Sequence, residues 1–174
     1  MIHISNRQRR IRIDSKAVKI FCGALSESLN ISDCAFSVIF VGTASMRRLN
    51  CEWRKKDGAT DVLSFTYGGE IVDGAPFLGE IVIAPEIAAL ARVSTSRRDQ
   101  GSGVMGQAGL QPAEGFVISP TEREIRKLIV HGTLHLAGYD HETDDGEMIV
   151  MQNRVLRRRF FTAAPYFIPR EKDR

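Results

Sequence analysis

The chain has few cysteines, and its apolar residues form no long run. The cysteines, Cys22, Cys34 and Cys51, lie far apart and form no CxxC pair, which excludes a zinc knuckle or a dithiol redox site and predicts reduced, buried thiols. The charged N-terminal segment MIHISNRQRR is not followed by an apolar stretch. We therefore expect neither a signal peptide nor a membrane span, and a cytoplasmic location.

Length and composition favour one globular domain over residues 1–174, with 43% apolar and 26% charged residues. Charge is uneven along the chain. Residues 1–20 carry a net charge of +5, residues 151–174 carry +5, and the middle carries −7. Basic ends suit a polyanion such as RNA, or are simply solvated termini. Residues 160–174 are expected to form a basic C-terminal tail.

Hydrophobic periodicity predicts strands and helices mixed in one α+β domain. Alternating isoleucines indicate strand structure at Ile2 to Ile4 and again at Ile11 to Ile13. The further expected elements are a helix from Asp14 or Ser15 to about Leu29 with Asn30 as its stop, a buried strand over 36–42, a helix capped by Thr43, strands over 61–65 and 80–84 joined as a hairpin, and a helix opened by Pro85. Residues 94–118 show neither the two-residue period of a strand nor the 3.6-residue period of a helix, and are expected to form a flexible insertion loop.

A helix is expected to begin at Ser119-Pro120-Thr121-Glu122, which combines an N-cap serine, a proline and a glutamate at the third position. Apolar residues then recur at helical spacing, with His131 and His135 beside that buried face. Residues four apart lie about 6 Å from each other along a helix axis. Their imidazoles can therefore bind one ion.

The segment HGTLHLAGYDH predicts a metal site on His131, His135 and His141. Gly138 stands where a left-handed residue ends a helix and turns the chain, so that His141 returns to the same ion. Three imidazoles with one open position are typical of one catalytic Zn²⁺ ion. A single histidine on an apolar face is more often a core residue, and His3 is interpreted as having no role at the site.

This spacing is that of the metzincin peptidases, HExxHxxGxxH, except that position 132 is glycine. The missing glutamate is the general base of those peptidases, so peptide hydrolysis is disfavoured. Asp140 is the best-placed candidate to orient an imidazole through its second nitrogen.

HGTLHLAGYDH closely resembles the signature of the YbeY family of metal-dependent endoribonucleases, bacterial factors for rRNA maturation. Two earlier segments are also similar to that family, in the same order. The first is Leu49-Asn50 with Trp53-Arg54 and then TDVLSF at 60–65, and the second is Gly79 to Ile83. The resemblance implies a zincin-like single domain, a small mixed β-sheet packed against helices with the metal site at a helix end.

The resemblance also places Arg54 in the cleft beside the metal, as a catalytic residue that grips a phosphate; without it, Arg54 would be an ordinary surface residue. With Arg47, Arg48, Lys55 and Lys56 it can contact an RNA backbone. Thr66 replaces the family's proline. The family's glutamate near Gln152 or Asn153 is absent from the expected closing helix, which carries Met148, Met151, Val155 and Leu156.

The resulting prediction is a zinc-dependent, single-strand-specific endoribonuclease that processes the 3′ end of 16S rRNA and acts in ribosome quality control. Its expected partners are rRNA in the small ribosomal subunit and ribosomal proteins. Two alternatives stay open: a non-catalytic zinc-binding ribosome assembly factor, and a zinc hydrolase of peptides or small molecules. Water and the RNA 2′-hydroxyl are both open as the nucleophile. The sequence does not indicate the oligomeric state.

Overall fold

The computed structural model describes residues 1–90, 118–158, 161, 167 and 168. Of the insertion loop expected over 94–118, only Ile118 falls within this part of the chain. Of the tail expected over 160–174, only Phe161, Phe167 and Ile168 do. Both expectations otherwise lie outside the described residues.

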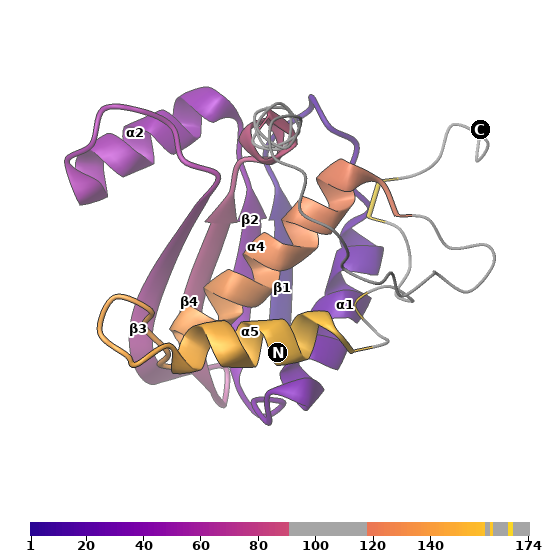
Figure 1. Cartoon of the computed structure of the whole chain (residues 1–174), viewed down its shortest axis with the longest axis vertical. Helices are drawn as coiled ribbons and strands as arrows, with labels where there is room; N and C mark the ends of the chain where they lie inside the picture. Colours follow the sequence, from indigo (N-terminus) through magenta and orange to yellow (C-terminus); the bar gives the residue numbers. More distant parts are fainter. Residues whose placement is uncertain (91–117, 159–160, 162–166, 169–174) are drawn as a thin grey trace, which may run out of the picture.

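A four-stranded mixed sheet forms the centre of the fold, as the sequence predicted (Figure 1). Its strands are β1 (Ile2–Asn6), β2 (Ala35–Phe40), β3 (Val62–Val72) and β4 (Ala75–Ile83). They lie in the order β1-β2-β4-β3. The β1/β2 and β2/β4 pairs are parallel and the β3/β4 pair is antiparallel. The β3 strand therefore lies at an edge of the sheet.

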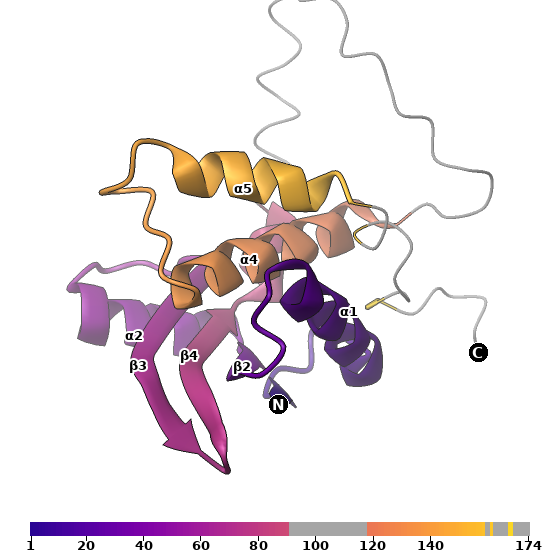
Figure 2. The ribbon, with the colours of Figure 1, turned by 90° about the horizontal axis from the view of Figure 1, so that it is seen from below.

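Three helices lie on one side of this sheet: the first two pack against it, and the third packs on the second (Figure 2). They are α1 (Ser15–Ser28), α4 (Pro120–Leu136) and α5 (Glu147–Leu156). Helix α2 (Thr43–Arg54) packs on the opposite face through a smaller apolar cluster that includes Ile39, Met46 and Val82. Residues 85–90 are also helical, as expected from Pro85.

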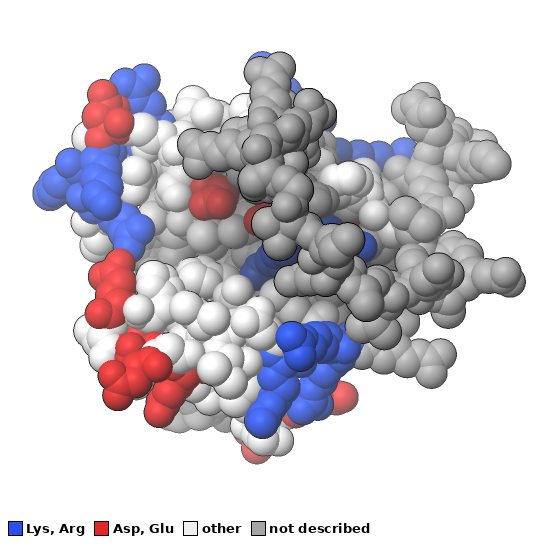
Figure 3. Space-filling view, in the orientation of Figure 1, with Lys and Arg blue, Asp and Glu red and all other residues white. Residues whose placement is uncertain are grey.

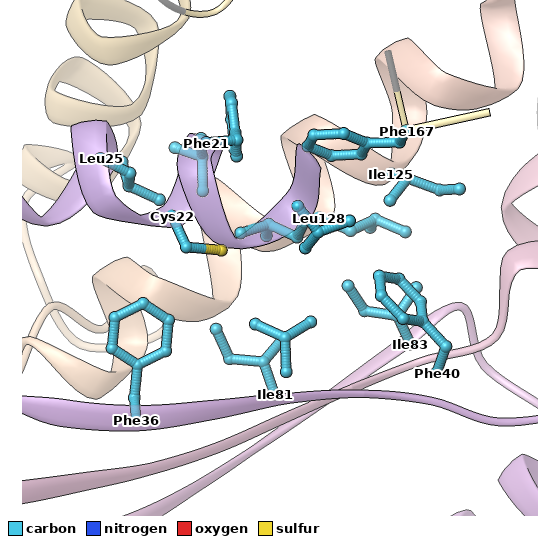
Figure 4. Close-up of a cluster of buried hydrophobic side chains, with 14 of the residues drawn as sticks. Phe21, Cys22, Leu25, Phe36, Phe40, Ile81, Ile83, Ile125, Leu128 and Phe167 are labelled. Carbon is cyan, nitrogen blue, oxygen red and sulfur yellow. The ribbon is translucent and has the colours of Figure 1, made fainter. Parts of the chain in front are cut away.

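The main core lies between the sheet and the α1/α4 layer. Figure 4 shows Phe36, Phe40, Ile81 and Ile83 rising from the strands toward Phe21 and the other helical side chains. Side chains from β4 point alternately to the two faces, so Ile81 and Ile83 enter this core while Val82 enters the smaller cluster. The core thus fixes α4 directly above β4.

A buried ion pair lies at the start of α4. Arg126 and Glu122 are both fully buried, and Arg126 donates to the carboxylate of Glu122 and to the backbone carbonyl of Phe161. The Arg126 guanidinium also lies 4.5 Å from the ring centroid of Phe167. Removing one partner of such a pair costs about 3–5 kcal/mol, so this pair holds the described C-terminal residues on α4.

The predicted strand at Ile11 to Ile13 is wrong. These residues form a loop in which the side-chain oxygen of Gln8 accepts from the backbone N–H groups of Arg10 and Ile11. The Gln8 amide also donates to the carbonyl of Ile11. Backbone groups that a strand ladder would use are thus satisfied by one side chain, while Ile13 is still buried.

Three other expectations need correction. The hairpin strands extend well beyond 61–65 and 80–84. They are joined by a turn at Asp73 and Gly74, which both have positive φ, and a register shift lets β3 continue through Gly68 and Gly69. The start of α2 is capped by the distant Glu86 carboxylate, which accepts from the backbone and hydroxyl of Thr43. All three thiols are free, but only Cys22 is buried, and Cys51 is exposed.

In the described part of the chain, no helix has the length and apolar character needed to cross a membrane.

Candidate metal centre

The helix that carries the site begins as its sequence predicts. Ser119 is the N-cap of α4, and its hydroxyl accepts from the backbone N–H of Glu122 at 3.1 Å. At the other end, Gly138 has a φ of +92°, which favours glycine. The backbone N–H of Tyr139 donates to the carbonyl of Leu134 at 3.0 Å and closes the turn that leads to His141.

Gly132, between the first two histidines, packs directly on the sheet. A Cβ at this position would lie 2.6 Å from Cγ2 of Ile81 and 3.1 Å from Oγ of Ser64. Ile81 is fully buried and β-branched, so it has little freedom to move away. The glutamate of the peptidase motif therefore has no room in this packing.

The imidazoles of His131, His135 and His141 converge. Each offers one nitrogen, and these three atoms lie within 4.8 Å of one another. The Nε2 atoms of His131 and His135 are 3.2 Å apart. Two nitrogens on a tetrahedral ion with metal–nitrogen bonds of about 2.0–2.1 Å are separated by about 3.3 Å, so this pair already has the spacing of two ligands.

Neighbouring groups fix which nitrogens face the centre. The carbonyl of Tyr139 lies 3.0 Å from Nδ1 of His135 and can only accept, so that Nδ1 carries the proton and Nε2 keeps its lone pair. The side-chain oxygen of Gln152 lies 3.0 Å from Nδ1 of His131 and acts in the same way. Two lone pairs then face each other at 3.2 Å, an arrangement that a cation between them stabilises.

The electrostatics of the site favour neutral imidazoles. Burial lowers the pKa of His131 and of His135 below the usual 6.5; His141 lowers both pKa values further, and His131 also lowers that of His135. Gln152 opposes the shift at His131, and the carbonyl of Tyr139 opposes it at His135. Since a metal ion binds the unprotonated ring, the site is prepared for a metal near neutral pH.

Asp140 does not orient a ring, contrary to the sequence-based expectation. Its carboxylate accepts from the backbone N–H of Glu142 and the hydroxyl of Thr143, which lowers its pKa. The orienting groups are Gln152 and the Tyr139 carbonyl. Sequence reasoning missed Gln152. Its helical spacing from Met148 and Val155 places it on the core-facing side of α5, but no sequence pattern shows which group it contacts.

The histidines lie in a cavity of about 620 Å³. It is lined by the three rings, by the edge strand over 62–66, by the turn over 138–142, and by Trp53 and Arg54 at the end of α2. Arg54 thus reaches the cavity of the histidines across the edge of the sheet, although the two lie far apart in sequence. Its catalytic role stays a prediction.

Charge is divided around this cavity (Figure 3). Basic side chains gather over α2 and the following turn, where the exposed members are Arg47, Arg48, Arg54, Lys55 and Lys56. Acidic side chains gather over the loop between α4 and α5, which carries Asp140, Glu142, Asp144 and Asp145. The acidic side suits a cation and the basic side suits an anionic substrate.

Comparisons with known proteins agree with this arrangement. The family model described as "Endoribonuclease YbeY" matches residues 3–98 and 111–159. The Endoribonuclease YbeY of Thermodesulfovibrio yellowstonii is 34% identical over 84% of this chain and 87% of its own length. That of Finegoldia magna is 32% identical over 88% of each chain.

A solved structure supports the fold. The solution structure of TM1509 from Thermotoga maritima is 28% identical, covers 90% of this chain and 87% of its own, and superposes with a TM-score of 0.51. Sequence, fold and the three-histidine centre therefore agree on one assignment: the chain belongs to the YbeY family of endoribonucleases, hydrolases of RNA phosphodiester bonds.

Proposed function

We propose that the protein is a zinc-dependent, single-strand-specific endoribonuclease that processes the 3′ end of 16S rRNA and takes part in ribosome quality control. The observation that carries this proposal is the convergence of His131, His135 and His141 in a cavity that Arg54 also lines. Its partners would be rRNA of the small ribosomal subunit and ribosomal proteins, which places it in the cytoplasm. The family relationship supports the RNA substrate.

The donor set fits one zinc ion, because three neutral imidazoles leave a fourth tetrahedral position free. Bound there, the ion would supply Lewis acidity to a phosphoryl oxygen and lower the pKa of a water molecule. The protein's own contribution is to hold the rings: Gln152 and the Tyr139 carbonyl fix the two Nδ1 protons and leave both Nε2 atoms unprotonated.

Arg54 would bind the scissile phosphate. Its planar guanidinium can donate two parallel hydrogen bonds to phosphoryl oxygens and stabilise the charge that develops on them during attack. The attacking group is either a water molecule or the adjacent 2′-hydroxyl of the RNA. A 5′-phosphate product with a free 3′-hydroxyl indicates water, and a 2′,3′-cyclic phosphate indicates the 2′-hydroxyl.

The packing of Gly132 on Ile81 disfavours the peptidase alternative, since it leaves no room for that motif's general base. The experiment compares single-stranded RNA, duplex RNA and casein as substrates of the same zinc-loaded preparation, with the exposed His3→Ala variant as control for His131→Ala. We expect cleavage of single-stranded RNA alone, abolished by His131→Ala. Rescue of a deletion strain by a folded, metal-free His131→Ala protein would favour the non-catalytic assembly factor.

A further inference from the structure

An exposed aromatic side chain lies at the edge of the histidine cavity and is not used by the metal centre. Trp53 lies in the last turn of α2, next to Arg54, and is 63% exposed. A single exposed apolar side chain is ordinary on a protein surface, so it is the position of Trp53 at this cavity that points to a ligand. Its ring packs edge-on against Phe65 of β3, with centroids 5.5 Å apart and planes at 68°. The indole is therefore braced while much of it faces solvent.

A second cavity adjoins the first. It has a volume of about 570 Å³ and lies on the α2 side of the sheet, where Ile39, Val41 and Val82 form its floor. Both cavities are lined by Trp53, Ser64, Phe65 and Thr66. Trp53 and the edge strand β3 thus stand between the histidine cavity and this second space. A chain held at the histidines can continue into it.

The lining of the second cavity suits a nucleobase better than a phosphate. Aromatic and aliphatic side chains dominate it, with Arg7 and Glu80 as its only charged groups among the described residues. Phe65 and Tyr67 are two residues apart on β3, and Tyr67 is 48% exposed and packs against Phe77 with centroids 5.6 Å apart. Aromatic rings beside a cationic backbone contact are how proteins hold unpaired bases.

We propose that Trp53 and the cavity behind it form a base-stacking subsite, in which the indole stacks on a nucleobase of single-stranded RNA next to the phosphate at the histidine centre. This proposal rests on the endoribonuclease function and deepens it. A paired base cannot leave its helix to enter the second cavity without unstacking, so the subsite would contribute to the preference for single strands. A protein ligand is the less favoured occupant, because the subsite is continuous with the metal cavity.

The test uses the fact that Trp53 is the only tryptophan of the chain. Protein stripped with a chelator is titrated with a ten-nucleotide single-stranded RNA carrying a fluorescent end label, and both tryptophan emission and RNA anisotropy are followed. Stacking quenches the emission in parallel with the rise in anisotropy. Inorganic phosphate and the corresponding duplex should leave the emission unchanged.

Two variants complete the test. Trp53→Ala is expected to bind the RNA about 5- to 150-fold more weakly, the range for loss of one stacked base, while Trp53→Phe keeps most of the affinity. Ile20→Ala, which removes an equally exposed apolar side chain on α1, is the control and should bind normally. Since Trp53 is exposed, these variants are expected to fold.

The outcomes separate the subsite from the proposed function. Unchanged emission on RNA binding, or normal affinity of Trp53→Ala, overturns the subsite, and a protein as the true occupant would give this result. If the zinc-loaded wild-type protein still cleaves RNA in that case, the proposed function stands without it. If the wild-type protein neither binds nor cleaves single-stranded RNA, both proposals fail.

Discussion

Gly132 of α4 and Ile81 of β4 pack so closely that a single added carbon at position 132 would lie 2.6 Å from Cγ2 of the isoleucine. This contact brings the histidine-bearing helix down onto the sheet, beside the edge strand that lines the metal cavity. It also excludes the glutamate that stands at this position in the peptidase motif with the same histidine spacing.

Gly132→Ala should therefore destabilise the protein. Overpacking costs about 1–3 kcal/mol, and the gain from removing a helical glycine is about 0.5–1 kcal/mol, so a net loss of about 1–2 kcal/mol is expected. Urea unfolding measures it. Gly23→Ala in α1, whose added carbon would meet nothing within 4 Å, is the matched control and should be neutral or stabilising. In an Ile81→Ala background the penalty of Gly132→Ala should disappear; an unchanged penalty there would refute the contact.

Gln152→Ala should weaken metal binding about 10- to 100-fold, because it releases the Nδ1 proton of His131 from its acceptor. Competition with a chromophoric chelator gives the affinity. The neighbouring Asn153 is exposed, so Asn153→Ala serves as the control. Gln152→Glu, which keeps an acceptor oxygen, should retain binding. Equal affinity of Gln152→Ala and the wild-type protein would show that the ring needs no such partner.

Acid should destabilise the metal-free protein. The pKa values of His131 and His135 are lowered in the folded state, so the unfolded chain binds protons first as the pH falls through 6.5. Protonation then favours unfolding, and stability rises again as the pH increases. Urea unfolding of chelator-treated protein between pH 8 and pH 5 measures this slope. Replacing both histidines with alanine should flatten this pH dependence of stability. An equally steep slope in that variant would show that other titratable groups cause it.

Arg54→Lys should reduce RNA cleavage strongly although it keeps the charge, because an ammonium cannot form the two parallel hydrogen bonds of a guanidinium. A loss of about 10²–10³ in kcat is typical when one donor to a developing oxyanion is removed. Arg48→Lys, at an exposed position earlier in α2, is the control. Since Arg54 is exposed at a helix end, the thermal stability of the Arg54→Lys variant should equal that of the wild-type protein. Normal cleavage by Arg54→Lys would show that this residue acts only through its positive charge, by attracting the RNA.

The parts of the fold that local patterns determine could be predicted from the sequence. The cap at Ser119, the turn at Gly138 and the convergence of the three histidines follow from spacing along one helix and the bend after it. The long-range contacts could not be predicted. No local pattern shows that Gln152 reaches His131 or that Glu86 caps the helix at Thr43, because α5 and residue 86 are placed by packing.

The strand predicted at Ile11 to Ile13 failed for a related reason. Alternation of apolar and polar residues is equally compatible with a loop that buries one isoleucine. Here the side chain of Gln8 stabilises the loop by accepting hydrogen bonds from its backbone. The orienting role predicted for Asp140 failed because its carboxylate faces its own loop, where it accepts from Glu142 and Thr143, and makes no hydrogen bond to a histidine ring.

The central claim is that an ion held by His131, His135 and His141 is required for RNA cleavage. Its most direct test is the initial rate of cleavage of single-stranded RNA as zinc is added back to chelator-stripped protein. The rate should rise from zero and saturate at one equivalent of zinc for the wild-type protein and His3→Ala, and stay at zero for folded His131→Ala. Full cleavage by stripped protein, or by His131→Ala, would contradict the account.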